Sequence, residues 1–155
     1  MPFELAWINE IFGDPLPLGC IKDKVSDFNA DIDDIYYLLL RYPNRMLANI
    51  TIDVISRPKA TRYLSIIGSD GKIDFDGDKN SIRYITADNN NWVEIFLDPG
   101  KVEEGYINPE EPYISEMRDF LEAVKSKDRK LFPNTLEMDV KVLSLLNSLE
   151  AMSSN

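Results

Sequence analysis

The segment from Ser56 to Arg62 carries the side chains best suited to binding a charged ligand. Arg57, Lys59 and Arg62 lie close together there, in a chain whose formal net charge is -10. Guanidinium and ammonium groups bind carboxylates and phosphates through charge-assisted hydrogen bonds, so this segment could bind an anionic substrate. The alternative interpretation is a solvated turn whose cations offset nearby acids, as most surface charges do.

Acid-base and nucleophilic chemistry lack their usual side chains in this sequence. It contains no histidine, so it cannot build a histidine-based triad or the common zinc sites. The single Cys20 cannot form an internal disulfide, and we expect it to be a small buried hydrophobic residue. Asp53 and Glu94 are strand carboxylates that could be considered for glycoside hydrolysis, but nothing in the sequence places them across a cleft.

The run from Asp74 to Asn80 alternates oxygen-bearing side chains in the manner of a calcium-binding loop. However, its glycine stands at the fourth place instead of the sixth, and Ile85 occupies the place of the bidentate glutamate. A hairpin turn is therefore the better interpretation, and the sequence predicts no metal site.

Hydrophobic periodicity and turn residues predict the elements that must position these side chains. Expected helices cover Leu5–Phe12, Tyr113–Val124 and Val142–Leu149, and expected strands cover Leu18–Phe28, Ile35–Tyr42, Met46–Ser56, Tyr63–Ile67, Lys72–Asp76, Ser81–Thr86 and Trp92–Leu97. Asn134 and Glu137 are spaced as a helix-capping pair. The acids at 29–34 are expected in solvent, and Asp98–Pro112 is expected to be an exposed connection.

These elements predict an α+β fold. We expect one large, mostly antiparallel open sheet with an N-terminal helix and two C-terminal helices on one face, forming a single domain over residues 1–152 with a frayed tail at 153–155. Ile35–Leu40 is apolar on both faces, which is typical of a central strand. Three helices cannot cover both faces of such a sheet, so we expect a second subunit to bury part of Tyr36–Leu40 and Ile50–Ile55.

Composition excludes several classes of protein. A chain of 155 residues, 44% hydrophobic and 28% charged, is typical of one globular domain. Its pI of about 4.5 argues against nucleic acid as a partner, because binding to phosphate backbones depends on clustered cations. No apolar run is long enough to span a membrane. The N-terminus lacks the basic and apolar regions of a secretory signal, so we expect a cytoplasmic protein.

Three stretches, in this order and spacing, resemble a known family. They are Glu4–Gly13, which includes Glu-Leu-Ala-Trp-Ile and Phe-Gly; Asp53–Pro58, which reads Asp-Val-Ile-Ser-Arg-Pro; and Leu64–Ile73, which contains Gly-Ser-Asp-Gly-Lys. Together with the order of elements they resemble the C-terminal domain of the glucose-fructose oxidoreductase, inositol dehydrogenase and rhizopine-catabolism (Gfo/Idh/MocA) family of NAD(P)-dependent dehydrogenases. The resemblance covers nearly the whole chain.

The resemblance implies that the cofactor belongs to another domain. In that family a Rossmann domain comes first and binds the nicotinamide cofactor, while the second domain supplies an open sheet whose faces close the substrate pocket and contact a second subunit. In this sequence no strand leads into a Gly-x-Gly-x-x-Gly turn that opens a helix. We expect this chain to bind no cofactor, and NAD or NADP to bind only where a Rossmann domain is present.

The resemblance also implies that catalytic residues are absent. At the positions where the family usually has a histidine and an aspartate, this sequence has Phe3 and Ala6, and neither can transfer a proton. The lysine of the family's Glu-Lys-Pro motif would belong to the missing domain. The resemblance also implies that the stretch with Arg57, Lys59 and Arg62 approaches the substrate, and their charges would suit the carboxylate of a sugar acid or the phosphate of a sugar nucleotide.

Taken together, these features predict the substrate-binding and dimerisation domain of an NAD(P)-dependent sugar or cyclitol oxidoreductase, inactive by itself. The expected partners are a second copy through the open sheet face and a separate Rossmann-domain chain. The alternative is a stand-alone dimeric binding or scaffolding module that has lost the catalytic residues, which Phe3 and Ala6 favour. A hydrolase with its own carboxylate pair is a weaker third hypothesis.

Overall fold

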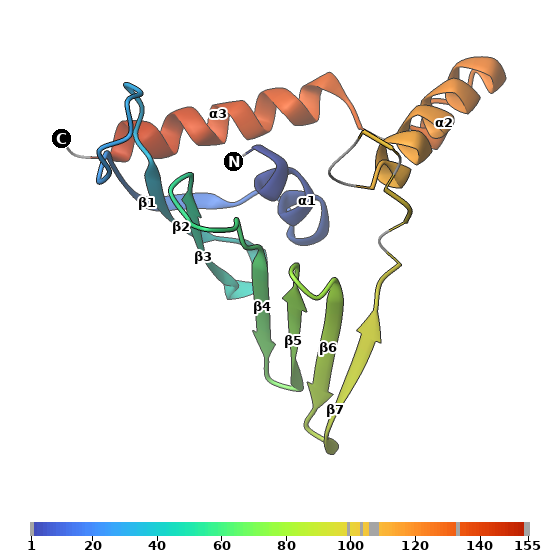
Figure 1. Cartoon of the computed structure of the whole chain (residues 1–155), viewed down its shortest axis with the longest axis horizontal. Helices are drawn as coiled ribbons and strands as arrows, with labels where there is room; N and C mark the ends of the chain where they lie inside the picture. The colour runs from blue at the N-terminus through green and yellow to red at the C-terminus, as the bar shows by residue number, and fades with distance from the viewer. Residues whose placement is uncertain (1, 99, 103, 106–108, 133, 154–155) are drawn as a thin grey trace. The chain divides into compact units, whose positions relative to one another are not determined.

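The computed structural model describes residues 2–98, 100–102, 104–105, 109–132 and 134–153. Its elements, in chain order, are α1 (Pro2–Phe12), β1 (Leu16–Asp23), β2 (Ile35–Arg41), η1 (Pro43–Arg45), β3 (Leu47–Asp53), β4 (Tyr63–Gly68), β5 (Gly71–Asp76), β6 (Ser81–Thr86), β7 (Asn89–Phe96), α2 (Glu111–Ser126), η2 (Arg129–Leu131) and α3 (Leu136–Met152) (Figure 1). The chain divides into two compact units. The first combines Met1–Pro58 with Asn134–Asn155, and the second is Lys59–Pro133.

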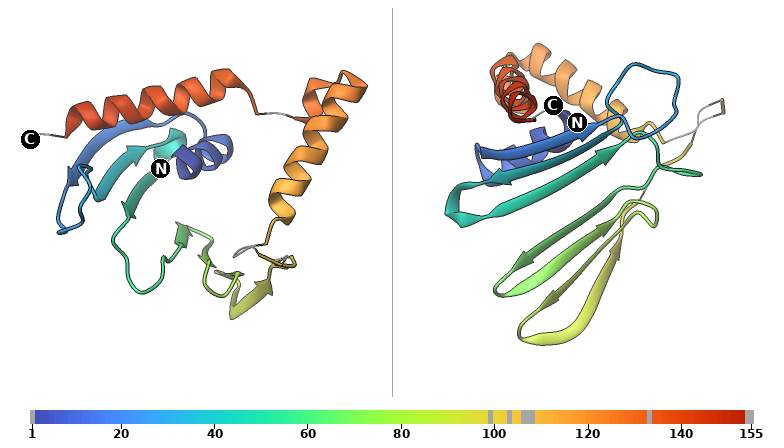
Figure 2. Two further views of the ribbon diagram at one scale, coloured as in Figure 1. Left: turned by 45° about the horizontal axis from the view of Figure 1, so that its top comes forward. Right: turned by 90° about the vertical axis from the view of Figure 1, so that its left-hand side faces the viewer.

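The first unit is built on a sheet of three antiparallel strands in the order β1-β2-β3. Helices α1 and α3 lie on one face of this sheet (Figure 2). Leu38 and Leu40 of β2 and Cys20 of β1 belong to the core between them. Leu5 of α1 and Leu149 of α3 are fully buried against them. Ile8, Tyr42, Val142 and Leu145 complete this core. Burial of apolar surface between these two helices and one sheet face therefore holds the unit together.

The opposite face of this sheet carries exposed apolar side chains among polar ones, because Arg41, Asn49 and Thr51 share it. Strand alternation places Tyr37 and Leu39 of β2 there, beside Ile21 of β1 and Leu47 of β3. Leu39 at the centre of this face is 50% exposed. We call these four residues the outer apolar face.

The loop between β1 and β2 is organised by a buried carboxylate. Asp34 is only 2% exposed. It accepts hydrogen bonds from the backbone N–H of Val25 at 2.8 Å and of Ser26 at 3.0 Å, and from the Ser26 hydroxyl. The expectation that the acids of this segment lie in solvent is therefore wrong for Asp34, because it satisfies backbone donors that would otherwise be unpaired.

The second unit contains a sheet of four antiparallel strands in the order β4-β5-β6-β7. Its register separates two kinds of face. The apolar face carries Leu64, Ile66, Ile73, Phe75, Ile82, Tyr84, Val93 and Ile95. The other face, which we call the polar face, carries Tyr63, Ser65, Lys72, Asp74, Asp76, Ser81, Arg83 and Glu94, together with the apolar Ile67, Ile85 and Phe96. Gly71 begins β5 where a Cβ atom would collide with the Ile85 carbonyl oxygen, so the close strand approach there requires glycine.

Helix α2 packs against η2, where the Phe120 and Phe132 rings meet edge to face with centroids 5.5 Å apart. The expected apolar stripe of this helix exists, but it is exposed. Its members are Tyr113, Met117, Phe120, Leu121 and Val124. The expectation that both C-terminal helices pack on a sheet is therefore met by α3, but α2 has no buried residue among those described.

The start of α3 corrects a second expectation. Thr135 is the N-cap residue, and its Oγ1 atom accepts a hydrogen bond from the backbone N–H of Met138 at 3.2 Å. The predicted pair of Asn134 and Glu137 was therefore displaced by one residue. Thr135 has the extended backbone that an N-cap residue needs.

The α+β class is confirmed, with antiparallel strands throughout both sheets. The described strands form two separately hydrogen-bonded sheets instead of the one large sheet expected. Strand positions were predicted well, although the first strand ends at Asp23 instead of Phe28 and the third at Asp53 instead of Ser56. Part of the expected tail, residues 154 and 155, and parts of the 98–112 connection lie outside the described residues.

Candidate functional site

The predicted cationic segment crosses the boundary between the two units. Arg57 lies in the first unit and donates from a guanidinium nitrogen to the carbonyl oxygen of Ser56 at 3.3 Å. Lys59, in the second unit, forms an ion pair of 3.0 Å with Asp78 in the turn after β5. The guanidinium carbon of Arg62 lies 5.9 Å from the centre of the Phe75 ring. The structure therefore places Lys59 and Arg62 beside the β5–β6 hairpin and Arg57 on another unit.

The two carboxylates considered for hydrolysis each have a local structural role. Asp53 Oδ1 accepts hydrogen bonds from the backbone N–H groups of Ile55 at 3.1 Å and Ser56 at 2.8 Å, which shapes the turn after β3. Glu94 Oε1 accepts a hydrogen bond of 3.1 Å from the Ser81 hydroxyl. They belong to different units.

The remaining sequence candidates fall in structural positions. Cys20 is buried in the first core, where burial is the main cause of the raised pKa of its thiol. Asp76 Oδ1 accepts hydrogen bonds from the backbone N–H groups of Asp78 and Lys79, as expected of a hairpin turn. Phe3 is 81% exposed on α1, and Ala6 is exposed on the same helix.

The most organised polar group in the structure is one that the sequence analysis missed. Asp74 is 1% exposed at the centre of the polar face of the β4–β7 sheet. Its Oδ2 atom accepts hydrogen bonds from Arg83 Nε at 3.1 Å and Arg83 Nη2 at 3.0 Å, and its Oδ1 atom lies 3.0 Å from the ammonium of Lys72. Arg83 in turn stacks on Trp92, with the guanidinium carbon 4.5 Å from the ring centre. We call these four residues the Asp74 cluster.

The charges of this cluster reinforce one another. Burial alone would raise the pKa of Asp74, but the contacts with Lys72, Ser65 and Arg83 outweigh burial and lower it to about 2. The hydrogen bond with Asp74 raises the pKa of Arg83. Asp74 is therefore an anion at neutral pH, and it holds two cations in fixed positions on the sheet.

The register of the hairpin could have revealed this cluster. Asp74 faces Arg83 across β5 and β6, Ser65 faces Asp74 from β4, and Glu94 faces Arg83 from β7. A turn at 77–80 between two expected strands pairs Asp76 with Ser81, and hence Asp74 with Arg83. The contribution of Trp92 could not be found in this way, because the β6–β7 pairing is shifted by a bulge close to it.

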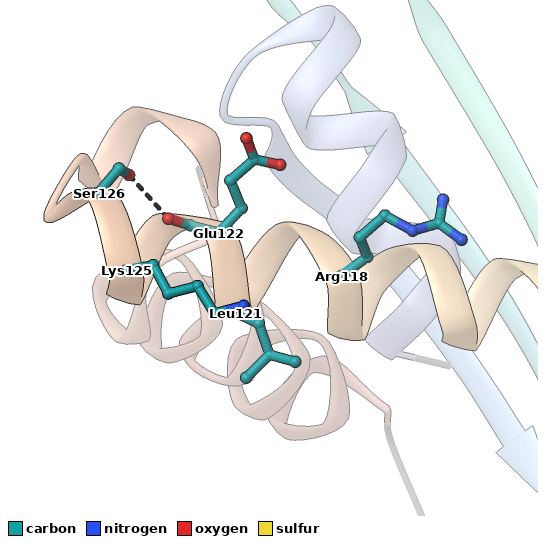
Figure 3. Close-up of a pocket in the computed structure, with 5 residues that line it drawn as sticks. All are labelled: Arg118, Leu121, Glu122, Lys125 and Ser126. Atoms are coloured by element: carbon teal, nitrogen blue, oxygen red, sulfur yellow. Dashed lines mark hydrogen bonds between the residues drawn. The ribbon is translucent and has the colours of Figure 1, made fainter.

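Surface hollows among the described residues include two that could be considered as ligand sites. One of about 540 Å³ is lined by Arg118, Leu121, Glu122, Lys125 and Ser126, all from α2 (Figure 3). A single helix face cannot surround a ligand, and Ser126 already donates to the carbonyl oxygen of Glu122 at 2.7 Å. The other, of about 330 Å³, lies at the β4–β5 turn around Gly68–Ile73. Small-molecule sites usually bury most of the ligand and converge polar groups on it, and these hollows do neither.

The part of the chain that the structure describes contains neither a dinucleotide-binding turn nor a cluster of metal ligands. Gly68 and Gly71 lie in a hairpin between two antiparallel strands, and no helix begins there to bind a pyrophosphate. No group of three or more cysteine or acidic side chains among these residues could hold a metal ion. Among the same residues, no helix is long and apolar enough to cross a membrane.

Several solved oxidoreductase structures share the fold of this chain. An oxidoreductase from Agrobacterium radiobacter has a TM-score of 0.78 at 14% identity, matching 99% of this chain and 45% of its own. An inositol dehydrogenase homolog from Azotobacter vinelandii has a TM-score of 0.73 at 11% identity, matching 98% and 44%. The UDP-N-acetylglucosamine 3-dehydrogenase GnnA from Acidithiobacillus ferrooxidans has a TM-score of 0.71 at 16% identity, matching 99% and 45%.

These matches confirm, at the level of the fold, the resemblance inferred from the sequence. The chain spans less than half the length of each of these structures. No protein-family model matches the sequence, and no curated protein matches it significantly.

Proposed function

We propose that this chain is the substrate-binding and dimerisation domain of an NAD(P)-dependent oxidoreductase that acts on a sugar or cyclitol, and that it is inactive by itself. The observation that carries the proposal is the shared fold, which covers nearly all of this chain but less than half of each oxidoreductase. The neighbours include an inositol dehydrogenase homolog complexed with NAD+ and a 3-ketoreductase complexed with NADP.

The absence of catalysis is proposed from residue chemistry. Phe3 and Ala6 stand where the resembling family has a proton-transferring pair, and neither side chain can exchange a proton. Since the described glycines form no pyrophosphate cradle, we assign nicotinamide binding to a separate Rossmann-domain chain or segment. Substituting Phe3→His should therefore not confer turnover on this chain.

Substrate binding and dimerisation are assigned to different surfaces. Arg57, Lys59 and Arg62 remain our candidates for contacting an acidic or phosphorylated part of the substrate, although Lys59 is already paired with Asp78. For dimerisation we propose the outer apolar face of the β1–β3 sheet. Exposed apolar patches of this kind commonly mark protein interfaces.

Light scattering of the purified chain, with and without NAD(H) and NADP(H), tests this proposal together with a thermal-shift scan. We expect a dimer whose mass and melting temperature do not change with either cofactor. A reproducible stabilisation by a cofactor would reveal a nucleotide site in this chain and overturn the assignment.

The second candidate is a stand-alone dimeric scaffolding module, which the same Phe3 and Ala6 replacements favour. The two functions differ in their response to a separate nucleotide-binding chain. Co-expression with a Rossmann-domain protein encoded nearby should give a complex that reduces NAD(P)+ with a sugar or cyclitol if the first proposal is right. A scaffold would form no such active complex.

A further inference from the structure

Helix α2 carries a continuous apolar stripe that is open to solvent. Ile114 belongs to this stripe as well, because it falls on the same side of the helix as the five residues named above. At 3.6 residues per turn the stripe covers about a third of the circumference, and no polar side chain interrupts it. Its members are Tyr113, Ile114, Met117, Phe120, Leu121 and Val124, each at least 42% exposed. An exposed apolar surface of this kind is typical of a protein interface.

The stripe lacks the cover that the other long helix of the chain has. A helix of this length gains most of its stability in a protein by packing its apolar face. Helix α3 does so by burying Val142, Leu145 and Leu149 in the core of the first unit. Helix α2 has no buried residue among those described, although its Phe120 ring meets the Phe132 ring. A further surface is therefore needed to cover the stripe.

The two edges of the stripe differ in charge. Arg118 and Lys125 lie along one edge, and Glu116 lies along the other. The hollow of about 540 Å³ on α2 is lined by both cations and by Leu121 (Figure 3). It is too open to enclose a small molecule, but it can accept a side chain from a partner's surface. Glu122 also lines it, so one net positive charge remains to pair with a carboxylate.

The spacing of the stripe favours a helix as the surface that covers it. Tyr113, Met117, Phe120 and Val124 follow one another at intervals of four, three and four residues. This is the spacing of a seam that packs against a second helix. A doubly wound nucleotide-binding domain has helices on both faces of its sheet, so its outer surface offers such helices.

The fold comparisons indicate which partner is missing. The shared fold includes 98–99% of this chain, and therefore α2, but 44–45% of the matched oxidoreductases. More than half of each of those chains thus lies outside the shared fold. The second copy of this chain is already assigned to the outer apolar face, on the other unit. The missing part of the enzyme is the partner left to cover α2.

We propose that a Rossmann-domain chain docks on α2, with one of its outer helices along the stripe from Tyr113 to Val124 and an acidic side chain between Arg118 and Lys125. This inference rests on the proposed function, which supplies the identity of the partner. It assigns to α2 the contact through which the two chains assemble.

Thiol accessibility tests the proposal on the full chain. The one cysteine of the sequence, Cys20, is buried, so Met117→Cys places a reactive thiol in the stripe. The matched control is Asp119→Cys, at an exposed position on the opposite side of α2. In the free chain at micromolar concentration both thiols should react with a maleimide at similar rates. The partner should slow Met117→Cys about tenfold or more, because a covered group reacts only when the contact opens. The rate of Asp119→Cys should not change.

The probes are the Rossmann-domain proteins of the source genome that lack a second domain of this fold, purified and mixed with the chain one at a time. Analytical ultracentrifugation should find one that forms a complex. Val124→Lys should weaken this complex about a hundredfold, since it buries an unpaired charge in the contact. Lys125→Glu should weaken it about tenfold, and less at high salt. Asp119→Lys, which adds the same charge as Val124→Lys outside the stripe, should leave the affinity unchanged.

Each measurement can overturn the proposal. Slow labelling of Met117→Cys in the free chain would show that the chain's own sheet or a second copy already covers the stripe. A genome without such a Rossmann-domain protein, a set of probes that form no complex, or a complex that Val124→Lys does not weaken would also exclude it.

The failure of this inference is distinguishable from that of the proposed function. A complex that depends on Val124 but does not reduce NAD(P)+ with a sugar or cyclitol would contradict the function and leave the docking site standing. An active complex that tolerates Val124→Lys would contradict the docking site alone.

Discussion

Asp74 is a buried anion paired with two partly exposed cations, and removing its charge should lower the free energy of unfolding. Asp74→Asn keeps the size of the side chain but leaves Lys72 and Arg83 without a counter-charge. We expect the free energy of unfolding to fall by about 2 kcal/mol at neutral pH, as for the loss of charged hydrogen bonds. Urea denaturation monitored by circular dichroism measures this. The control Asp119→Asn, on the exposed surface of α2, should have little effect.

The same carboxylate predicts a pH dependence of stability. Its pKa is lowered from 3.8 to about 2 in the folded state, so the unfolded chain binds its proton first. The contribution of Asp74 is therefore complete above pH 4 and is lost as the pH falls from about 4 toward 2. The difference in unfolding free energy between the native protein and Asp74→Asn should shrink over this range. A difference that stays constant down to pH 2 would contradict the prediction.

Asp34 is a second buried carboxylate, and its role is local. It accepts from the backbone N–H groups of Val25 and Ser26 and from the Ser26 hydroxyl, which lowers its pKa although burial opposes the shift. Asp34→Ala should expose these two amides to solvent. Hydrogen exchange measured by NMR should show them exchanging faster, while the amides of β6 keep their protection. Unchanged protection at Val25 and Ser26 would contradict this role.

At the scale of elements, the N-terminus of α3 offers a matched pair of substitutions. Thr135→Ala removes the side-chain oxygen that accepts from Met138 N–H, and should cost about 1 kcal/mol of stability. Asn134→Ala, at the neighbouring position that the sequence favoured, should be close to neutral. Thermal and urea denaturation of the two variants show whether Thr135 or Asn134 caps the helix. A larger loss of stability in Asn134→Ala than in Thr135→Ala would contradict the Thr135 cap and support the predicted pair of Asn134 and Glu137.

Elements were predictable where their signal is local. Ser81–Thr86 was predicted with both of its ends, because alternating side chains and flanking turns lie within the segment itself. The exposure of the stripe on α2 was not predictable, since periodicity reveals an apolar face but not the surface that covers it. The overlong first strand has a similar cause, because its loop folds back onto Asp34, whose burial depends on the backbone of Val25 and Ser26.

The Asp74 cluster and the cationic segment show the same contrast between what a local pattern predicts and what depends on long-range pairing. The pairing of Asp74 with Arg83 follows from the hairpin turn and was within reach of the sequence. The stacking of Arg83 on Trp92 depends on a third strand and on a bulge in its pairing, which no local pattern encodes. The cationic segment was conspicuous in the sequence because its charges are adjacent, yet the structure distributes Arg57 and Arg62 over two units.

At the scale of the whole molecule, the chain divides into two units where the sequence predicted one large sheet. Seven strands with similar alternation and short turns look like one meander. The hydrogen bonds, however, group the described strands into sets of three and four, separated by the segment that joins β3 to β4. Fold class therefore follows from the kinds of element, whereas sheet continuity depends on pairing between strands distant from any turn.

The outer apolar face supplies the last prediction. Leu39 lies at its centre on β2, 50% exposed, opposite Gly19 of β1 and Asn49 of β3. If a second copy covers this face, Leu39→Glu should bury two carboxylates against apolar surface, which is too costly for association. Light scattering at micromolar concentration should then show a monomer where the native chain is a dimer. Val124→Glu, which places the same charge on the exposed stripe of α2, should leave the mass unchanged. A Leu39→Glu variant that remains dimeric would exclude this face as the interface, because no closely packed apolar contact tolerates an unpaired charge at its centre.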